Sequence, residues 1–198
     1  MRFGATIIAA QMLVTVAIAQ TPSEKAVSIL NEVCVVPTSS EERMTAGEKA
    51  AVKENWKLIW SKAIPTPLKQ NENAKTVMSA WEFNLPEGSR ARLIVGIMRP
   101  ELPDYKDTYC LIESEIILDS DDITQSIDRQ FGSAVTKDVS GRFKHEKRWF
   151  FTAEKSAGNC GKYIWVPLGE RGKTKTLTFH DFVYSSDWPA AELARCPN

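Results

Sequence analysis

Residues 77–97, VMSAWEFNLPEGSRARLIVGI, decide the fold of this chain. Apolar side chains recur at every second position along 77–85, except at Ser79, and again along 91–97, which is the period of a strand with one buried face. Between the two runs, Pro86-Glu87-Gly88-Ser89 has the composition of a turn. The stretch therefore predicts a long β-hairpin.

Two helices are expected before the hairpin. Thr21-Pro22-Ser23-Glu24 is a capping box with proline at the first helical position, and Pro37 is expected to end the helix that it starts. Thr45-Ala46-Gly47-Glu48 repeats the capping pattern. The second helix is predicted from an apolar stripe at helical spacing, and Pro65 would stop it. The stripe consists of Val52, Trp56, Ile59 and Trp60.

More strands and one further helix are expected after the hairpin. A third strand is predicted from Thr108 to Ile117. Ser120 is expected to cap a helix that Gly132 ends. Its apolar face would hold Ile123, Ile127 and Phe131. The remaining strands are predicted near residues 146–153, 162–168 and 174–184.

This order of elements predicts an α+β fold. Helices come first and strands follow, with one helix inserted, which favours a mostly antiparallel sheet of about five to six strands. The N-terminal helices and the inserted helix would pack on one face, and the other face would be partly open to water. The chain has 198 residues and is 43% hydrophobic, so a core of normal size is possible. We expect one domain over residues 20–198.

Residues 1–19, MRFGATIIAAQMLVTVAIA, have the pattern of a secretory signal peptide. Arg2 gives a short positive start, an apolar run follows, and Ala17 and Ala19 are small residues of the kind that signal peptidase selects. The run is short for a membrane-spanning helix. We expect cleavage before Gln20 and a periplasmic or secreted chain without a membrane span; an uncleaved anchor or a first core helix is the alternative.

Export determines how the cysteines are interpreted. Cys34, Cys110, Cys160 and Cys196 are an even set with wide spacing and no C-x-x-C pair. In an oxidising compartment such a set predicts structural disulfides rather than a zinc site or a redox pair. More than one connectivity is possible. We favour Cys34–Cys110, which would pin the first helix to a central strand, and Cys160–Cys196, which would tie the C-terminal tail to a turn.

No motif in the chain indicates a cofactor, a metal or a catalytic residue. Glycine-rich nucleotide loops and H-E-x-x-H are absent from the sequence. His145 lies in a basic segment, and His180 and Asp181 would point to opposite faces of a strand, so their adjacency does not make a dyad. Lys and Arg number 25 against 25 Asp and Glu, which argues against a nucleic-acid partner.

The charged residues suggest a possible binding surface. Basic residues and one tryptophan gather in a single segment as Arg142, Lys144, Lys147, Arg148 and Trp149. Acidic residues opposed to them are Glu113, Glu115, Asp119, Asp121 and Asp122. Such polarity would steer a charged partner. The two glutamates share one face of a strand and are expected to be solvated rather than catalytic.

The layout resembles that of small uncharacterised exported proteins of Gram-negative bacteria. The features in common are a signal peptide, an early helix ending in Cys34, tryptophans in the middle of the chain, Cys110 in a strand, a helix closing on Phe131-Gly132, and a later strand with Trp149. The tryptophans are Trp56, Trp60 and Trp81. That group has no assigned activity, so the resemblance implies a periplasmic location and an architecture only.

These observations predict a non-enzymatic, disulfide-stabilised exported protein that binds another protein or an envelope component. The open sheet face, the charge polarity and the lack of a catalytic motif are the grounds for this hypothesis. Two alternatives remain. One is a periplasmic hydrolase whose site is assembled from distant residues. The other is an inhibitor that inserts a loop, such as residues 99–107, into a cell-wall enzyme.

Overall fold

The computed structural model describes residues 20–65, 75–99, 106–137, 146–151, 160–168 and 173–183. The helices are α1 (Pro22–Leu30), which continues as a π-helical turn η1 (Asn31–Val35), α2 (Ser40–Glu54) and α3 (Ser120–Phe131). The strands are β1 (Lys57–Pro65), β2 (Lys75–Asn84), β3 (Arg90–Arg99), β4 (Lys106–Asp119), β5 (Val135–Lys137), β6 (Glu146–Phe151), β7 (Cys160–Pro167) and β8 (Lys173–Val183).

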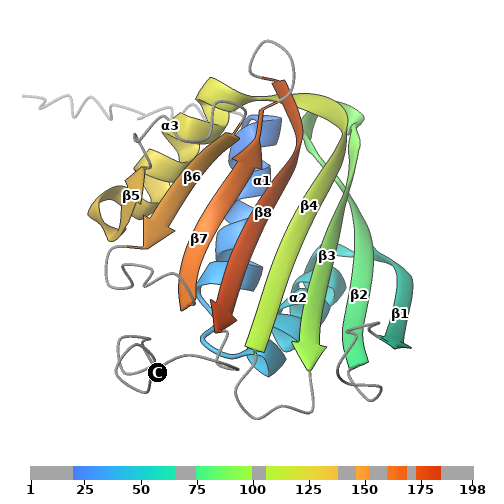
Figure 1. Cartoon of the computed structure of the whole chain (residues 1–198). Coiled ribbons are helices and arrows are strands. Elements are labelled where there is room, and N and C mark those ends of the chain that lie inside the picture. The colour runs from blue at the N-terminus through green and yellow to red at the C-terminus, as the bar shows by residue number, and fades with distance from the viewer. Residues whose placement is uncertain are drawn as a thin grey trace, which may run out of the picture.

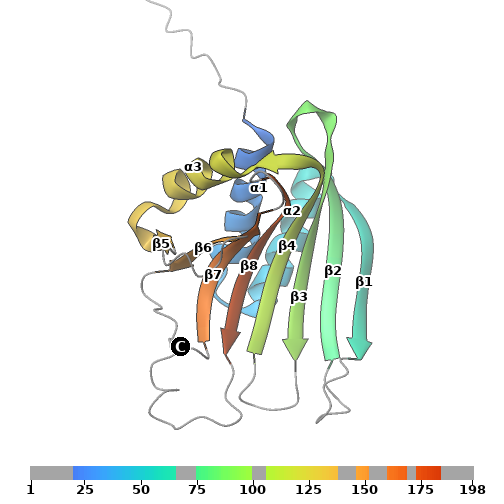
Figure 2. The same cartoon turned by 45° about the horizontal axis from the view of Figure 1, so that its top comes forward.

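All the strands belong to one antiparallel sheet of eight strands in the order β1-β2-β3-β4-β8-β7-β6-β5. Figures 1 and 2 show α1 and α2 on one side of this sheet, with α3 beside α1. The predicted α+β class and its layout are confirmed. The predicted number of strands was too low, because β1 and the short β5 were not expected.

The hairpin that decides the fold is confirmed. Strands β2 and β3 pair from Lys75 opposite Arg99 to Asn84 opposite Arg90 without a register shift. The chain reverses through Pro86–Gly88, where Glu87 and Gly88 have φ of 68° and 78°. Since glycine adopts positive φ at little cost, Gly88 suits this position.

The first helix begins as predicted. Thr21 is the N-cap of α1: its backbone N–H donates to Glu24 Oε2 at 2.9 Å, and its hydroxyl accepts from the Glu24 N–H at 3.2 Å. The predicted start of the second helix was wrong. Ser39, not Thr45, caps α2, and it forms the capping box with Glu42.

The predicted end of the second helix was also wrong. Asn55 adopts the left-handed conformation with φ 55° and ends α2, so Trp60 lies in the edge strand β1 rather than on a helix. Val52, which the stripe placed in the core, is 85% exposed. Trp56 lies between the helix and the strand and packs on Phe83, with ring centroids 5.0 Å apart.

Helix α3 agrees with the prediction except at its cap. Asp119 rather than Ser120 is the N-cap, and its carboxylate accepts from the N–H groups of Asp121 and Asp122. Ile123 and Ile127 are buried. Gly132, with φ 51°, follows the last helical residue as expected.

The core fills the space between the helices and one face of the sheet. Among its fully buried side chains are Leu30, Leu93, Ile112, Ile127, Trp149, Ile164, Leu177 and Phe179. Helix α2 approaches the sheet closely at Gly47, where a Cβ would lie 2.9 Å from the Trp81 ring.

One covalent bond crosses this core. The predicted disulfide between Cys34 and Cys110 is confirmed, and it joins the helical N-terminal segment to the central strand β4 across 76 residues. The second predicted pair, Cys160 with Cys196, lies outside the described side chains. The expected signal peptide, residues 1–19, also lies outside the described residues.

Candidate functional site

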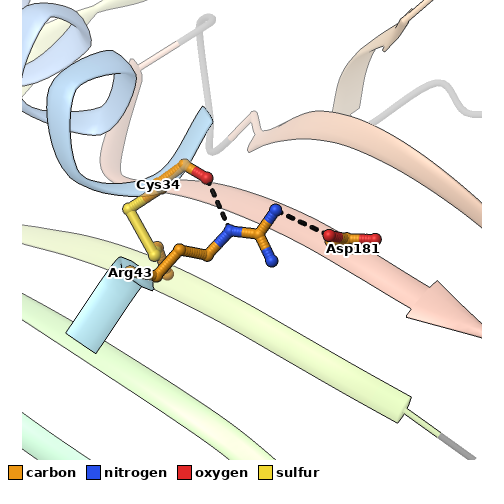
Figure 3. The surroundings of a disulfide bond; sticks show 4 residues. Cys34, Arg43 and Asp181 are labelled. Atoms are coloured by element: carbon orange, nitrogen blue, oxygen red, sulfur yellow. Dashed lines mark hydrogen bonds and ion pairs between the residues drawn. A yellow bond between two sulfur atoms is a disulfide. The ribbon is translucent and has the colours of Figure 1, made fainter. Parts of the chain in front are cut away.

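The buried polar cluster beside the disulfide is the first candidate (Figure 3). Arg43 of α2 is fully buried, and its Nη2 lies 2.6 Å from Oδ2 of Asp181 on β8. Its Nε donates to the Cys34 carbonyl oxygen at 2.7 Å, and the guanidinium lies 5.2 Å from the ring centroid of Phe179. Because the charges pair with each other inside the core, this cluster joins α2 to the sheet and offers no accessible binding group.

The sheet face opposite the helices carries a row of rings. Phe150 on β6, Tyr163 on β7, His180 on β8 and Tyr109 on β4 are register partners across adjacent strands, and we call these four residues the aromatic row. Successive ring centroids are 5.6, 4.9 and 6.5 Å apart. The rings therefore form a continuous line across strands that are far apart in the sequence.

A glycine lets the row extend to the next strands. Gly96 of β3 is the register partner of Tyr109, and a Cβ at this position would lie 2.4 Å from Cζ of the tyrosine ring. Tyr109 thus lies over the backbone of Gly96, and its hydroxyl donates to Sδ of Met78 on β2 at 3.4 Å. Any larger residue at 96 would displace the ring.

Polar and charged groups beside the row pair with one another. Trp165 on β7 donates through Nε1 to Oε2 of Glu146 at 2.5 Å. Arg148 pairs with Oε1 of the same carboxylate, with Nη2 at 2.5 Å, and its guanidinium lies 5.6 Å from the ring centroid of Tyr163. The row is therefore flanked by one neutralised ion pair rather than by free charge.

His180 is a neutral member of the row. Burial, and then the positive charge of Arg148, lower its pKa to about 4, so the imidazole carries no charge at pH 7. Asp181 faces the helices, as strand alternation predicted, and pairs there with Arg43. Among the described residues no carboxylate is hydrogen-bonded to the His180 ring, so the groups of a catalytic dyad are not brought together there.

The other end of the same face is charged, and we call it the charged end. A shallow hollow of about 250 Å³ is lined there by Glu82, Arg90, Arg92, Glu113, Glu115 and Lys175, together with Ala91 and Ser114. Arg90 lies 2.8 Å from Glu115 and 3.9 Å from Glu82. Glu113 and Glu115 are exposed, as expected for solvated carboxylates. Acidic and basic side chains balance, so this hollow has no excess charge with which to attract an ion.

A second hollow, of about 440 Å³, lies between α1 and α3 and is lined by Gln20, Glu24, Ser28, Ser126, Arg129 and Gln130. Arg129 Nη1 lies 2.6 Å from Glu24. The backbone N–H of Thr21, and then Arg129, lower the pKa of Glu24. Neither hollow contains a histidine, and the described residues hold no group of three or more potential metal ligands.

The predicted basic surface does not form a single surface. Lys147 faces the helices and donates to Thr124 and Asp121 of α3, whereas Arg148 lies on the opposite face of β6. Trp149 is fully buried in the core, so it cannot contribute to a binding surface. Arg142 and Lys144 lie outside the described residues, as does His145.

Sequence reasoning missed the aromatic row. Alternate positions in β6, β7 and β8 carry Phe150, Tyr163, Trp165 and His180, which the sequence displays. Their alignment depends on the register between strands, which the sequence does not display.

In comparisons with known proteins, no family model, no curated protein and no solved structure matches this chain. Within the described ranges, no helix has both the length and the apolar character needed to cross a bilayer.

Proposed function

We propose that this chain is an exported, disulfide-stabilised protein that acts by binding another protein through the aromatic row. One observation carries the proposal. The sheet face that no described helix covers presents four aligned rings, with Trp165 beside them and Met78 at the end of the line. We propose no catalytic step.

The composition of this face is what an interface requires. An antiparallel sheet with one solvated face usually presents polar side chains there. Here the rings of the aromatic row are only half-buried. Ile94 and Leu111, which lie between the row and the charged end, are half-buried as well. Such a cluster of partly exposed rings is the composition expected of an interface, since protein interfaces are enriched in tyrosine, tryptophan, phenylalanine, methionine and arginine.

The ring geometry favours a protein over a glycan as the binding partner. A sugar ring stacks on an aromatic face that is open to solvent. The faces of Tyr163 are engaged, because His180 stacks on it with an interplanar angle of 18° and Arg148 lies over it. With both partners in place, Tyr163 offers no open face to a sugar ring. The zero net charge argues against nucleic acid.

Export is part of the proposal. The leader-like segment 1–19 supports it, and so does the disulfide, since such bonds persist in the periplasm and outside the cell but are rare in the cytosol. The alternatives gain no comparable support. A hydrolase would need a carboxylate at His180, and the loop 99–107 of the inhibitor hypothesis lies largely outside the described residues.

A capture experiment with matched variants tests the proposal. Tagged mature chain, its Tyr163→Thr/His180→Thr variant and a Glu113→Thr control would each be incubated with an envelope extract, after circular dichroism has shown that all three are folded. Threonine suits a strand, and Glu113 lies at the charged end of the same face. We expect the wild type and the control to retain the same protein and the double variant to lose it. Equal capture by all three, or loss with the control alone, would contradict the proposal.

A further inference from the structure

We infer that residue 20 of the exported chain is a modification site, where the N-terminal glutamine is converted to pyroglutamate. The inference rests on the export in the proposed function, because Gln20 must become the first residue before it can react. It combines the expected cleavage position with the way in which the first described helix is capped.

The first described helix is capped by the residue that follows. The Thr21 N–H donates to Glu24, its hydroxyl accepts from the Glu24 N–H, and Pro22 opens the helix. Glu24 is in turn held by Arg129 of α3 at 2.6 Å. Thr21 is therefore fixed to two helices, and cleavage after Ala19 would leave a single residue, Gln20, ahead of this anchored cap.

Gln20 has room to react. Its side chain is exposed, and it borders the hollow of about 440 Å³ between α1 and α3. Ring closure requires rotation only about the bonds of Gln20 itself. The hydrogen bonds of the capping box involve Thr21 and Glu24, so they persist in the product.

The reaction is an intramolecular aminolysis that needs no oxidant and no second substrate. The α-amino nitrogen of Gln20 attacks its own side-chain Cδ, a new C–N bond closes a five-membered lactam, and the Cδ–NH₂ bond breaks to release ammonia. The neutral amine is the nucleophile. Since α-amino groups have a pKa near 8, roughly a tenth of the chains carry the reactive form at pH 7.

The product suits its place at the start of α1. The first turn of a helix carries a partial positive charge, so an α-ammonium group one residue before the N-cap is repelled. Cyclisation removes that charge and leaves an amide. It also removes the free amine that aminopeptidases require, and thereby protects the end of the chain that supports the α1–α3 contact.

The test uses the full chain, with its leader, expressed in a Gram-negative host. Protein purified from the periplasmic fraction would be held at neutral pH and examined by intact mass and Edman degradation. A matched Gln20→Asn variant is the control, since its shorter side chain would have to close a strained four-membered ring. We expect the wild type to be blocked to Edman degradation and to be lighter by one ammonia than residues 20–198. Pyroglutamyl aminopeptidase should remove the block. Edman degradation of the variant should give Asn in the first cycle.

The outcomes separate this inference from the proposed function. A wild-type chain that starts at a free Gln20 after prolonged incubation would overturn the modification and leave export intact. A chain that starts at another residue after export would also overturn it. Retention of Met1 in the cytosolic fraction would contradict both the modification and the export on which it rests.

Discussion

The two faces of the sheet contain similar residues that are restrained in different ways. On β8, Phe179 lies in the core beneath the helices and beside Arg43, whereas the next residue, His180, lies in the aromatic row. The covered face is restrained by a disulfide and a buried ion pair. The open face is restrained by ring contacts, by the ion pair that flanks the row and by the ion pairs of Arg90 at the charged end. The comparison teaches that a covalent bond and a buried ion pair fix the covered face to the helices, while side-chain contacts between strands order the open face.

The largest effect is expected from removing the disulfide. A Cys34→Ala/Cys110→Ala variant should lose about 4.5 kcal/mol in free energy of unfolding, because the bond closes a loop of 76 residues in the unfolded chain. Urea unfolding measures the loss. A loss below about 1 kcal/mol would show that the covered face does not depend on this bond.

Breaking the buried ion pair should lower the free energy of unfolding slightly less than removing the disulfide does. Arg43→Met leaves the Asp181 carboxylate without its cation beside the core, and removing one partner of a buried pair typically costs about 3–5 kcal/mol. Urea unfolding again measures the loss. The double variant Arg43→Met/Asp181→Leu should recover most of it, since no unpaired charge remains. If the single variant is as stable as the wild type, the pair does not hold α2 to the sheet.

His180 should make the open face sensitive to acid. Its pKa falls from 6.5 to about 4 in the folded protein, because of burial and then Arg148. Below pH 6.5 the unfolded chain therefore binds a proton that the folded chain does not, and stability falls as the pH approaches 4. The neutral imidazole contributes up to about 3 kcal/mol to the free energy of unfolding, and this contribution is fully present above pH 6.5.

Unfolding measured at several pH values tests this expectation. A His180→Gln variant serves as the control, since carboxylates titrate in the same range in both proteins. The wild type should lose more stability than the variant between pH 6.5 and 4. Parallel pH profiles would show that the imidazole is not desolvated in the row.

Gly96→Ala should have the smallest effect on stability and a clear effect on the row. Its Cβ would lie 2.4 Å from the Tyr109 ring, so the ring must move, at a cost of about 1–3 kcal/mol. Near-ultraviolet circular dichroism should change with the aromatic environment. In a Tyr109→Leu background the same substitution should cost less, and an equal cost in both backgrounds would contradict the close approach.

Much of the fold could be predicted because it depends on local chemistry. The capping box at Thr21, the turn at 86–89 and the stop at Gly132 each involve neighbouring residues. Strand β1 was not predictable in this way. The residues around Trp56 and Trp60 fit a helical stripe as well as a strand, and the choice was decided by Asn55 at the helix end and by pairing with β2.

The candidate site was less accessible from the sequence. Strand alternation correctly separated His180 from Asp181, because it acts between adjacent residues. The same alternation separates Lys147 and Trp149 from Arg148, so Trp149 lies in the core and the predicted surface was wrong for this residue. The aromatic row depends on the pairing of β4 with β8 and of β7 with β8, which is a property of the whole sheet.

Photo-cross-linking from the open face tests the central claim most directly. The photoreactive residue p-benzoylphenylalanine would replace Tyr163 in the aromatic row or, in a second protein, Glu113 at the charged end, and both would be irradiated in intact cells. We predict a cross-linked adduct with one protein from position 163 and none from position 113. No adduct from position 163, or the same adduct from both positions, would contradict the claim that the aromatic row is the binding surface.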